Sequence, residues 1–514
     1  MIQDFAFVAF VLFLTLASYF LAGCFQWSKV HLPLPPGPKG YPILGNLFDL
    51  HNKQRWVKFL GWSKEYNSEI IHLRVLGSSI IVLNSLKVAN DLLSTRSILY
   101  SDRPALIMVN ELLGWASLFS GMPYAHAWRS RRRAFWQEFN PNRTANHRPS
   151  QMRYCRNLLS RLLDKPSDFV HHIEYTLAAS ILSATYGIDV MPEHDPNIER
   201  ARKALTSLSD AAISGLFLVD IFPFLRHVPS WMPGAGFKRF AEKSRPDTMD
   251  MLNAPFVEGC NRLRDGKSEP SLLSRLLRAD GGHPLEDCPN EQLVRDVAAV
   301  AYTGGAETTK AALSNFIAAM LLYPEVQKKA QQEVDSFTRS ALPSFEDLPN
   351  MPYVQATMLE VLRWQSVLPL GIAHRLTMDD EYEGYYMPKG SIVFVNVWAL
   401  LRDEERYPNP DTFRPERFLK DGAIDSKLAE PMPGFGFGRR ICPGRFFAME
   451  SLWLNIASIL TVFDITKAKD EEGRDIEPDI KWTPNFTRHL IPFTCSITPR
   501  SSEREKLIRD SEPM

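Results

Sequence analysis

The sequence predicts a mainly α-helical domain with a minor β-sheet (α+β), placed behind an N-terminal transmembrane segment. Three observations support this fold class. Helical patterning dominates from about residue 86 to 337, short β-rich runs occur near 70–83 and 372–397, and residues 5–28 carry no charge. There is no internal repeat or interior linker. We therefore expect four segments: an anchor (1–28), a proline-rich hinge (29–45), one large domain (46–500) and a charged C-terminal tail (501–514).

The apolar run from Phe5 to Ser28 is long enough to span a bilayer, which needs roughly 20 such residues. A cleaved signal would begin with basic residues, whereas Asp4 flanks this run. Lys29 and Lys39 follow it, so the positive-inside rule places the main body in the cytosol. We expect a single uncleaved anchor rather than lipid attachment at Cys24.

The segment Pro33–Pro38 contains four prolines in six residues. Such a run cannot be helical, and we expect a stiff, extended spacer between the anchor and the domain. A ligand for a proline-binding module is the alternative.

Composition excludes several classes of protein. The 59 basic and 59 acidic residues balance, so no overall field attracts nucleic acid. The six cysteines are scattered without CxxC pairs, which argues against a zinc site or a disulfide scaffold and suits a reducing compartment.

Residues Ile70–Val75 and Ile80–Leu83 predict a hairpin across Gly77. Strand character returns at 372–376 and 391–397. On the first of these strands His374 and Arg375 face opposite ways, because side chains alternate along a strand.

A long helix is predicted from Glu291 to Tyr323, with Pro324 ending it. Its centre, Gly304-Gly-Ala-Glu-Thr-Thr309, departs from helical preference. Adjacent glycines weaken a helix by about 1 kcal/mol each relative to alanine, and threonine hydroxyls can bond back to carbonyls. We expect a locally opened turn where a carboxylate and a hydroxyl hold water. The alternative is a glycine pair used for helix packing.

The stretch Phe435–Ala448 holds Cys442 among glycines and arginines, directly before an apolar helical pattern. Arg439 and Arg440 can pair with anions or lower the pKa of a nearby thiol. A helix starting near Gly444 also favours a thiolate. A thiolate on a glycine-lined wall is typical of a proximal haem ligand. The alternative is a buried structural cysteine.

The phrase Phe-x-x-Gly-x-Arg-x-Cys-x-Gly in this stretch resembles the haem-binding loop of the cytochrome P-450 family at every position. The resemblance implies haem b with Cys442 as the axial ligand of its iron. It also implies that Trp128 and Arg132, four apart on a helix, bind a haem propionate, with Arg440 and His374 as further cofactor-binding residues. Arg375 is the alternative to His374.

Other motifs follow the family's order. Glu307 and Thr308 match the acid and threonine that help to deliver protons to dioxygen, and Lys310 replaces a residue that is usually small or apolar. Glu360, Arg363 and Arg417 match charges that lock together beneath the haem and hold the cysteine loop. The other arginines near Trp128 are Arg129, Arg131 and Arg133. We expect them to point away from the haem, toward an acidic electron donor.

The resemblance implies a haem-thiolate monooxygenase that inserts one oxygen atom from O2 into a small apolar substrate. With no nucleotide-binding glycine motif or flavin domain, the chain would take electrons from a separate NADPH–cytochrome reductase. The implied location is the endoplasmic reticulum membrane, single-pass, with the catalytic domain cytosolic. The chain resembles microsomal fungal members that tailor secondary metabolites, which favours a terpenoid. The pocket is expected to be lined by residues within 103–119, 205–231, 298–308 and 367–372 and near Phe486.

Three other functions are compatible with these residues. The same haem site could serve isomerisation, dehydration or peroxide chemistry, although an intact Glu307–Thr308 pair argues against this. The protein could be a haem sensor or carrier without turnover. It could also be a membrane-tethered interaction protein that binds no haem.

Overall fold

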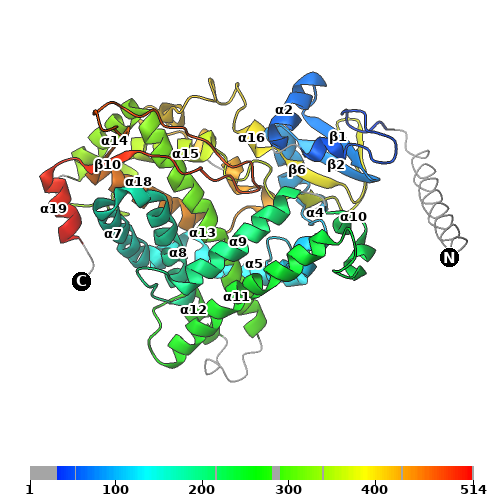
Figure 1. Ribbon diagram of the computed structural model, residues 1–514. Helices are drawn as coiled ribbons and strands as arrows, with labels where there is room; N and C mark the ends of the chain where they lie inside the picture. The colour runs from blue at the N-terminus through cyan, green and yellow to red at the C-terminus, as the bar shows by residue number, and fades with distance from the viewer. Residues whose placement is uncertain are drawn as a thin grey trace, which may run out of the picture.

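The computed structural model describes residues 32–51, 54–214, 217–279, 290–338, 341–429 and 432–511, which form a large helical body with a small sheet at one side (Figure 1). The fold is the predicted α+β class. The expected anchor, 1–28, lies outside these ranges. Within them, no helix combines the length and the apolar character needed to cross a membrane.

The helical body is built from twelve helices of eight or more residues within the described ranges. They are α2 (Arg55–Glu65), α5 (His126–Phe139), α7 (Arg148–Asp164), α8 (Phe169–Tyr186), α9 (Pro196–Ser214), α11 (Gly236–Arg264), α12 (Leu272–Ala279), α13 (Glu291–Leu322), α14 (Pro324–Phe337), α15 (Pro352–Trp364), α18 (Arg445–Val462) and α19 (Ser502–Asp510). Shorter helices include α3 (Leu86–Asn90), α4 (Ser97–Tyr100), α6 (Pro141–Thr144), α10 (Leu218–Ile221), α16 (Val397–Leu400), α17 (Ser426–Ala429) and the π-helix η3 (Met108–Leu112).

The main sheet has the strand order β1–β2–β6–β3, in which β2 and β6 are parallel and the other pairs antiparallel. Its strands are β1 (Ile70–Val75), β2 (Ser78–Leu83), β3 (His374–Arg375) and β6 (Ile392–Val395). The predicted hairpin is present, and Leu76 and Gly77 both adopt positive φ in its turn. Three two-stranded sheets pair β4 (Asp380–Tyr382) with β5 (Tyr385–Met387), β7 (Leu419–Lys420) with β8 (Ala423–Ile424), and β9 (Phe463–Thr466) with β10 (Ser496–Pro499).

The proline-rich segment has no regular secondary structure over residues 33–40, as the sequence predicts, but it is hydrogen-bonded to β1 of the main sheet and to β5 of a two-stranded sheet. The backbone N–H of His72 donates to the Pro36 carbonyl at 2.9 Å, and that of Tyr386 donates to the Pro33 carbonyl at 2.7 Å. A Cβ atom on Gly37 would lie 2.0 Å from the His72 carbonyl oxygen. Only glycine therefore allows this close approach.

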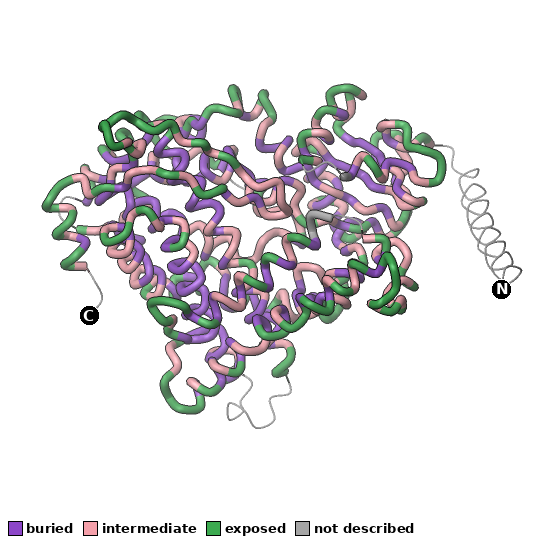
Figure 2. The backbone as a smooth tube through the Cα atoms, viewed as in Figure 1, coloured by how far each residue is buried: buried purple, intermediate pink, exposed green. Residues whose placement is uncertain are grey.

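The core consists of two large apolar clusters and a smaller one under the sheet (Figure 2). Helix α8 is buried on all sides in its last twelve residues, which explains its almost continuous apolar sequence. Helix α13 contributes to both large clusters, through residues up to Ala306 in one and from Ala312 onward in the other. The segment between them therefore lies where the two cores meet.

Helix α13 is continuous from Glu291 to Leu322, so the predicted opening at its centre is wrong. The Thr308 hydroxyl does bond back, donating to the Gly304 carbonyl at 2.7 Å. The two glycines serve different purposes. A Cβ on Gly305 would lie 2.7 Å from the Ile181 side chain, whereas a Cβ on Gly304 would meet nothing within 4 Å. Gly305 thus permits helix packing, and Gly304 borders open space.

The charged C-terminal segment contains a folded helix, α19, rather than only a tail. Its Ile508 is fully buried in the larger core cluster, and Arg504 pairs with Asp335 of α14 at 2.9 Å. The helix packs on α7 and α18, so it belongs to the folded domain.

Candidate active site

The cysteine loop turns sharply before α18, with Gly444 at the position preceding the helix. The Cys442 N–H donates to the Phe435 carbonyl at 2.7 Å, which closes the loop. Gly438 has φ +49°, and a Cβ there would lie 2.1 Å from the carbonyl oxygen of Leu93. The loop is therefore pressed against the chain that follows α3 in a conformation that glycine alone adopts easily.

The Cys442 thiol experiences opposing influences. Burial raises its pKa, while hydrogen bonds from the N–H groups of Gly444 and Arg445 and the positive charges of Arg132 and Arg445 act in the opposite direction. Helix α18 thus presents its N-terminal N–H groups to the sulfur, as expected. Of the two alternative roles predicted for Arg439 and Arg440, lowering the pKa of the thiol falls instead to Arg132 and Arg445. Pairing with an anion remains open to Arg439 and Arg440. Arg439 donates to the hydroxyls of Ser97 and Tyr124.

Trp128 and Arg132 share a face of α5, as predicted, and both meet the cysteine loop. The Arg132 guanidinium donates to the Ile441 carbonyl at 2.6 Å. The Arg440 guanidinium lies 4.4 Å from the centre of the Trp128 ring, a cation–π distance. Arg440 also donates to the carbonyls of Ser101 and Met122, both at 2.7 Å. The loop, α5 and the chain after α4 are thereby joined.

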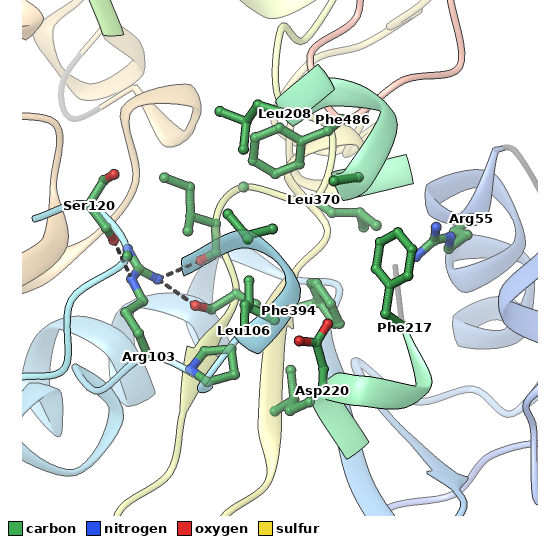
Figure 3. A pocket seen from close by; sticks show the side chains of 18 of the residues that line it. Arg55, Arg103, Leu106, Ser120, Leu208, Phe217, Asp220, Leu370, Phe394 and Phe486 are labelled. Atoms are coloured by element: carbon green, nitrogen blue, oxygen red, sulfur yellow. Dashed lines mark hydrogen bonds between the residues drawn. The ribbon is translucent and has the colours of Figure 1, made fainter. Parts of the chain in front are cut away.

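His374 is buried and Arg375 exposed, so the strand alternation is as predicted. The Nδ1 atom of His374 donates to the Tyr100 carbonyl at 2.7 Å. Beside it lies Arg103, which is also buried and donates to the carbonyls of Ser120, Ile372 and Ala373 (Figure 3). The pKa of His374 is well below its ordinary value, because burial and then the charges of Arg103 and Arg440 disfavour the imidazolium.

These cations converge with little negative charge to balance them. Burial lowers the pKa of Arg132 and of Arg440 to about 10, and it lowers the pKa of Arg103 well below its ordinary value. Arg440 repels both Arg103 and Arg132, while the carboxylate of Asp102 attracts Arg103 and Arg440. The three guanidinium charges of Arg103, Arg132 and Arg440 would be balanced by the Asp102 carboxylate together with the two propionates of one haem. The residues present therefore fit the group that the sequence predicts.

One of the three arginines next to Trp128 differs from its predicted role. Arg131 was expected to face an electron donor, but it binds the buried Asp296 of α13 at 2.6 Å. Arg129 and Arg133 are exposed, which is compatible with such a role.

Glu360, Arg363 and Arg417 form the predicted charge cluster. Arg363 and Arg417 lie 2.7 and 3.1 Å from the Glu360 carboxylate, and all three side chains are almost completely buried. Their remaining N–H groups donate to the carbonyls of Leu401, Pro408 and Thr412. The cluster therefore fixes the chain between α16 and β7. The resemblance predicted that the cluster would hold the cysteine loop, but these bonds do not reach that loop.

The centre of α13 brings Glu307 and Thr308 to the side of the open space at Gly304. The helix packs on both α5 and α18, which flank the cysteine loop. Lys310 is directed to Glu174 of α8, at 3.1 Å. Its place in the motif is thus explained by an ion pair.

An apolar cavity of about 250 Å³ lies beside Arg103 (Figure 3). Four of the five expected segments line it, contributing among others Leu106, Leu208, Phe217, Leu370 and Phe486. Within the part of the chain that the structure describes, no residue of 298–308 lines this cavity. The sheet side, through residues such as Trp56 and Phe394, was not predicted.

Sequence reasoning missed the place of Arg103 in the cationic cluster, and it missed His489, whose Nε2 atom lies 2.9 Å from the Glu307 carboxylate. Asp220 belongs to the predicted lining segment 205–231, but its carboxylate was not singled out. None of the three carries a local sequence signal for these contacts, because each meets its partners only through the tertiary fold.

A cysteine held by helix N–H groups beside a cationic cluster that fits propionates defines a haem-thiolate protein. Comparison with known proteins is in agreement. The family model for cytochrome P-450 matches residues 35–490, and the chain belongs to that family. It is 44% identical over 489 residues to cytochrome P-450 monooxygenase 98 of Postia placenta, covering 94% of each chain.

Two further relatives cover similar shares. Cytochrome P-450 monooxygenase ple1 of Rhodocybe pseudopiperita is 43% identical over 94% of this chain and 92% of its own. Tryptamine 4-monooxygenase of Psilocybe cyanescens is 39% identical over 95% of this chain and 98% of its own. The chain is thus a cytochrome P-450 monooxygenase, which uses haem with a cysteine thiolate ligand, O2, and electrons from a reductase.

Proposed function

We propose that Cys442 supplies the axial thiolate of haem b and that Trp128, Arg132, His374, Arg440 and, in addition, Arg103 bind its propionates. The observation that carries this proposal is the cluster of buried cations next to the cysteine loop, which Asp102 alone leaves unbalanced. When bound, a haem-thiolate activates O2 so that one oxygen atom enters a C–H bond and the other leaves as water.

Glu307 and Thr308 are the residues proposed to supply the protons for that water. The Thr308 hydroxyl is held by the Gly304 carbonyl next to open space, and the Glu307 carboxylate is one residue earlier on the same helix. General acids placed in this way typically contribute 10²–10⁴-fold to rate.

The substrate proposed is a small apolar molecule, with a terpenoid skeleton favoured. The cavity is lined mainly by aliphatic and aromatic side chains, which suit a hydrocarbon. A second candidate is an aromatic amine. It is favoured by the Asp220 carboxylate in the cavity wall and by the similarity to an enzyme named for tryptamine.

The domain is further proposed to follow a single N-terminal anchor (1–28) in the endoplasmic reticulum membrane, facing the cytosol and its NADPH–cytochrome reductase. Exposed apolar side chains support a membrane contact: Tyr41, Ile43 and Phe48 near the described N-terminus, and Leu218, Phe224 and Trp231 around α10. Both groups belong to one end of the molecule, because Leu47 and Ile221 pack on the same cluster under the sheet (Figure 1).

The first experiment is the reduced, carbon-monoxide difference spectrum of membranes that express the full chain, beside Cys442→Ala. A strongly red-shifted band in the wild type alone is expected. A haem band without that shift would favour a sensor with another ligand, and no haem band from folded protein would exclude the haem proposal.

Substrate class is tested next by the spectral shift that a ligand causes when it enters the haem pocket. A sesquiterpene hydrocarbon and tryptamine are compared, in wild type and Asp220→Asn. Preference for the hydrocarbon, unaffected by Asp220→Asn, supports the first candidate, whereas tryptamine binding that is lost in Asp220→Asn supports the second. Reductase-dependent hydroxylated product would exclude isomerisation and carrier functions.

A further inference from the structure

The Glu307 carboxylate is held on two sides. His489 Nε2 lies 2.9 Å from one oxygen, and Lys310 Nζ lies 3.9 Å from the other. Burial raises the pKa of Glu307, but the hydrogen bond from His489 and the charge of Lys310 more than offset it, so the pKa lies below its ordinary value. The carboxylate is therefore ionised at rest and needs a proton donor before it can act as an acid.

Lys310 is unsuited to that task, because its ammonium group is committed elsewhere. It lies 3.1 Å from one oxygen of Glu174, whose other oxygen accepts from Arg202 at 2.9 Å. Arg202 in turn pairs with Glu199 at 2.8 Å. These alternating charges join α13, α8 and α9. Because each cation is held by carboxylates of a neighbouring helix or its own, the chain of ion pairs fixes the three helices and leaves Lys310 directed to Glu174.

His489 is placed differently. It lies in a turn that is closed by a hydrogen bond from the Thr483 N–H to the His489 carbonyl at 2.8 Å. Next to this bond, a β-bridge pairs Trp482 with Leu490. The same turn carries Phe486 into the cavity wall. About a quarter of the His489 side chain is exposed, so water reaches it. An imidazole can accept a proton at one nitrogen and release one from the other.

We propose that His489 is the positioning and proton-supplying residue for Glu307. This rests on the proposed relay through Glu307 and Thr308. In each turnover one oxygen of O2 leaves as water, taking two electrons from NADPH through the reductase and two protons. His489 accepts a proton from solvent water at Nδ1 and releases the proton on Nε2 to the Glu307 carboxylate. Glu307 then passes that proton toward Thr308, and the same transfer is repeated for the second proton. Lys310, held by Glu174, keeps the carboxylate turned toward His489.

The test uses the full chain with its reductase, NADPH and O2, without an organic substrate. Complete reduction of O2 to water consumes two NADPH and two protons, whereas release of hydrogen peroxide consumes one of each. His489→Gln keeps an N–H donor for Glu307 but cannot relay a proton. We expect it to fold with a normal carbon-monoxide spectrum, and water formation to fall at least about 10-fold, since a positioned acid typically contributes 10²–10⁴-fold. A water yield equal to wild type would reduce His489 to a structural hydrogen bond and overturn the proposal.

A matched control is His171→Gln, since His171 is an exposed histidine on α8 and should behave as wild type. Glu307→Gln separates the two proposals. If Glu307→Gln loses water formation and His489→Gln does not, only the role of His489 fails; if Glu307→Gln has no effect, the relay itself fails. If both proposals hold, the double variant is no worse than Glu307→Gln, because the residues act in series.

A readout independent of turnover is the ring-nitrogen NMR of protein labelled with ¹⁵N-histidine, with the His489 signals assigned by their loss in His489→Gln. The signals should move in Glu307→Gln and stay unchanged in Glu291→Gln, a variant of an exposed carboxylate on the same helix. Unchanged His489 signals in Glu307→Gln would show that the contact does not form.

Discussion

Arg131 Nη2 lies 2.6 Å from Asp296 Oδ2, with the two side chains only 15% and 2% exposed. The Gln292 side chain donates to the other oxygen of Asp296 at 2.6 Å. This ion pair joins α5, which carries Trp128 and Arg132, to α13, which carries Glu307. The helices on which the proposed propionate and proton-relay residues lie are thereby fixed to each other by charge as well as by packing.

Asp296→Ala should lower the free energy of unfolding by about 3–5 kcal/mol, because it removes the carboxylate that pairs with the largely buried Arg131 guanidinium and leaves it the Ala127 carbonyl. Denaturant titration of the detergent-solubilised chain measures the loss. Arg133→Ala, at an exposed position of α5, should change it by less than about 0.5 kcal/mol. Equal effects of the two substitutions would contradict the buried-pair interpretation.

Gly438→Ala should strongly reduce haem content, because the new Cβ would lie 2.1 Å from the Leu93 carbonyl in a left-handed conformation. Gly434→Ala is the matched control in the same loop, since nothing lies within 4 Å of its Cβ. The haem-to-protein ratio of purified samples distinguishes them. Normal haem content in Gly438→Ala would mean that the loop can move away from Leu93.

Arg103→Ala should accelerate transfer of haem to an acceptor protein, because it removes a buried cation from the proposed propionate site. The exposed Arg129→Ala should not. Arg103→Lys should recover only part of the loss, since a lysine cannot also satisfy the carbonyls of Ser120, Ile372 and Ala373. Haem transfer from Arg103→Ala at the wild-type rate would remove Arg103 from the cofactor site.

Asp220 should make the protein less stable as the pH rises from about 4 to about 6. Burial raises its pKa from 3.8 to about 6, against backbone N–H donation from Met108 and Ile107. Within this window the folded state binds a proton that the unfolded state has lost, so the free energy of unfolding falls by about 1.4 kcal/mol for each pH unit. Above this pH window, Asp220 is ionised in both states and lowers the free energy of unfolding by a constant amount.

Asp220→Asn lacks this titration. Relative to wild type, its free energy of unfolding should therefore rise between pH 4 and pH 6.5 and then level off. Asp250→Asn, an exposed carboxylate on α11, provides the comparison. A wild-type-minus-Asp220→Asn difference that does not depend on pH would show that Asp220 is ionised normally.

Much of the site could be predicted because its residues are local in sequence. The cysteine loop and the first turn of the helix after it lie within fourteen residues, and Trp128 and Arg132 are one helical turn apart. Helix α13 begins at Glu291 and gives way to α14 at Pro324, positions set by local start and stop signals.

What could not be predicted depends on tertiary contacts. Arg131 reads as a surface charge until the fold places Asp296 beside it. Pro246 and Pro255 would each end an isolated helix, yet α11 continues through both, packed on α9 and α13. The adjacent glycines suggested an opened α13, but Gly305 is needed because Ile181 of α8 approaches closely.

With the proposed anchor in place, the attachment of Pro33 to β5 and of Pro36 to β1 would limit how the domain orients itself on a bilayer. A membrane segment ending near residue 28 would be about five residues, or roughly 17 Å of extended chain, from the first hydrogen bond at Pro33. So short a tether has no slack for the domain to tumble over the lipid. The same face would then meet the membrane at all times, and an apolar molecule dissolved in the lipid would encounter α10, beside the cavity, without first crossing water.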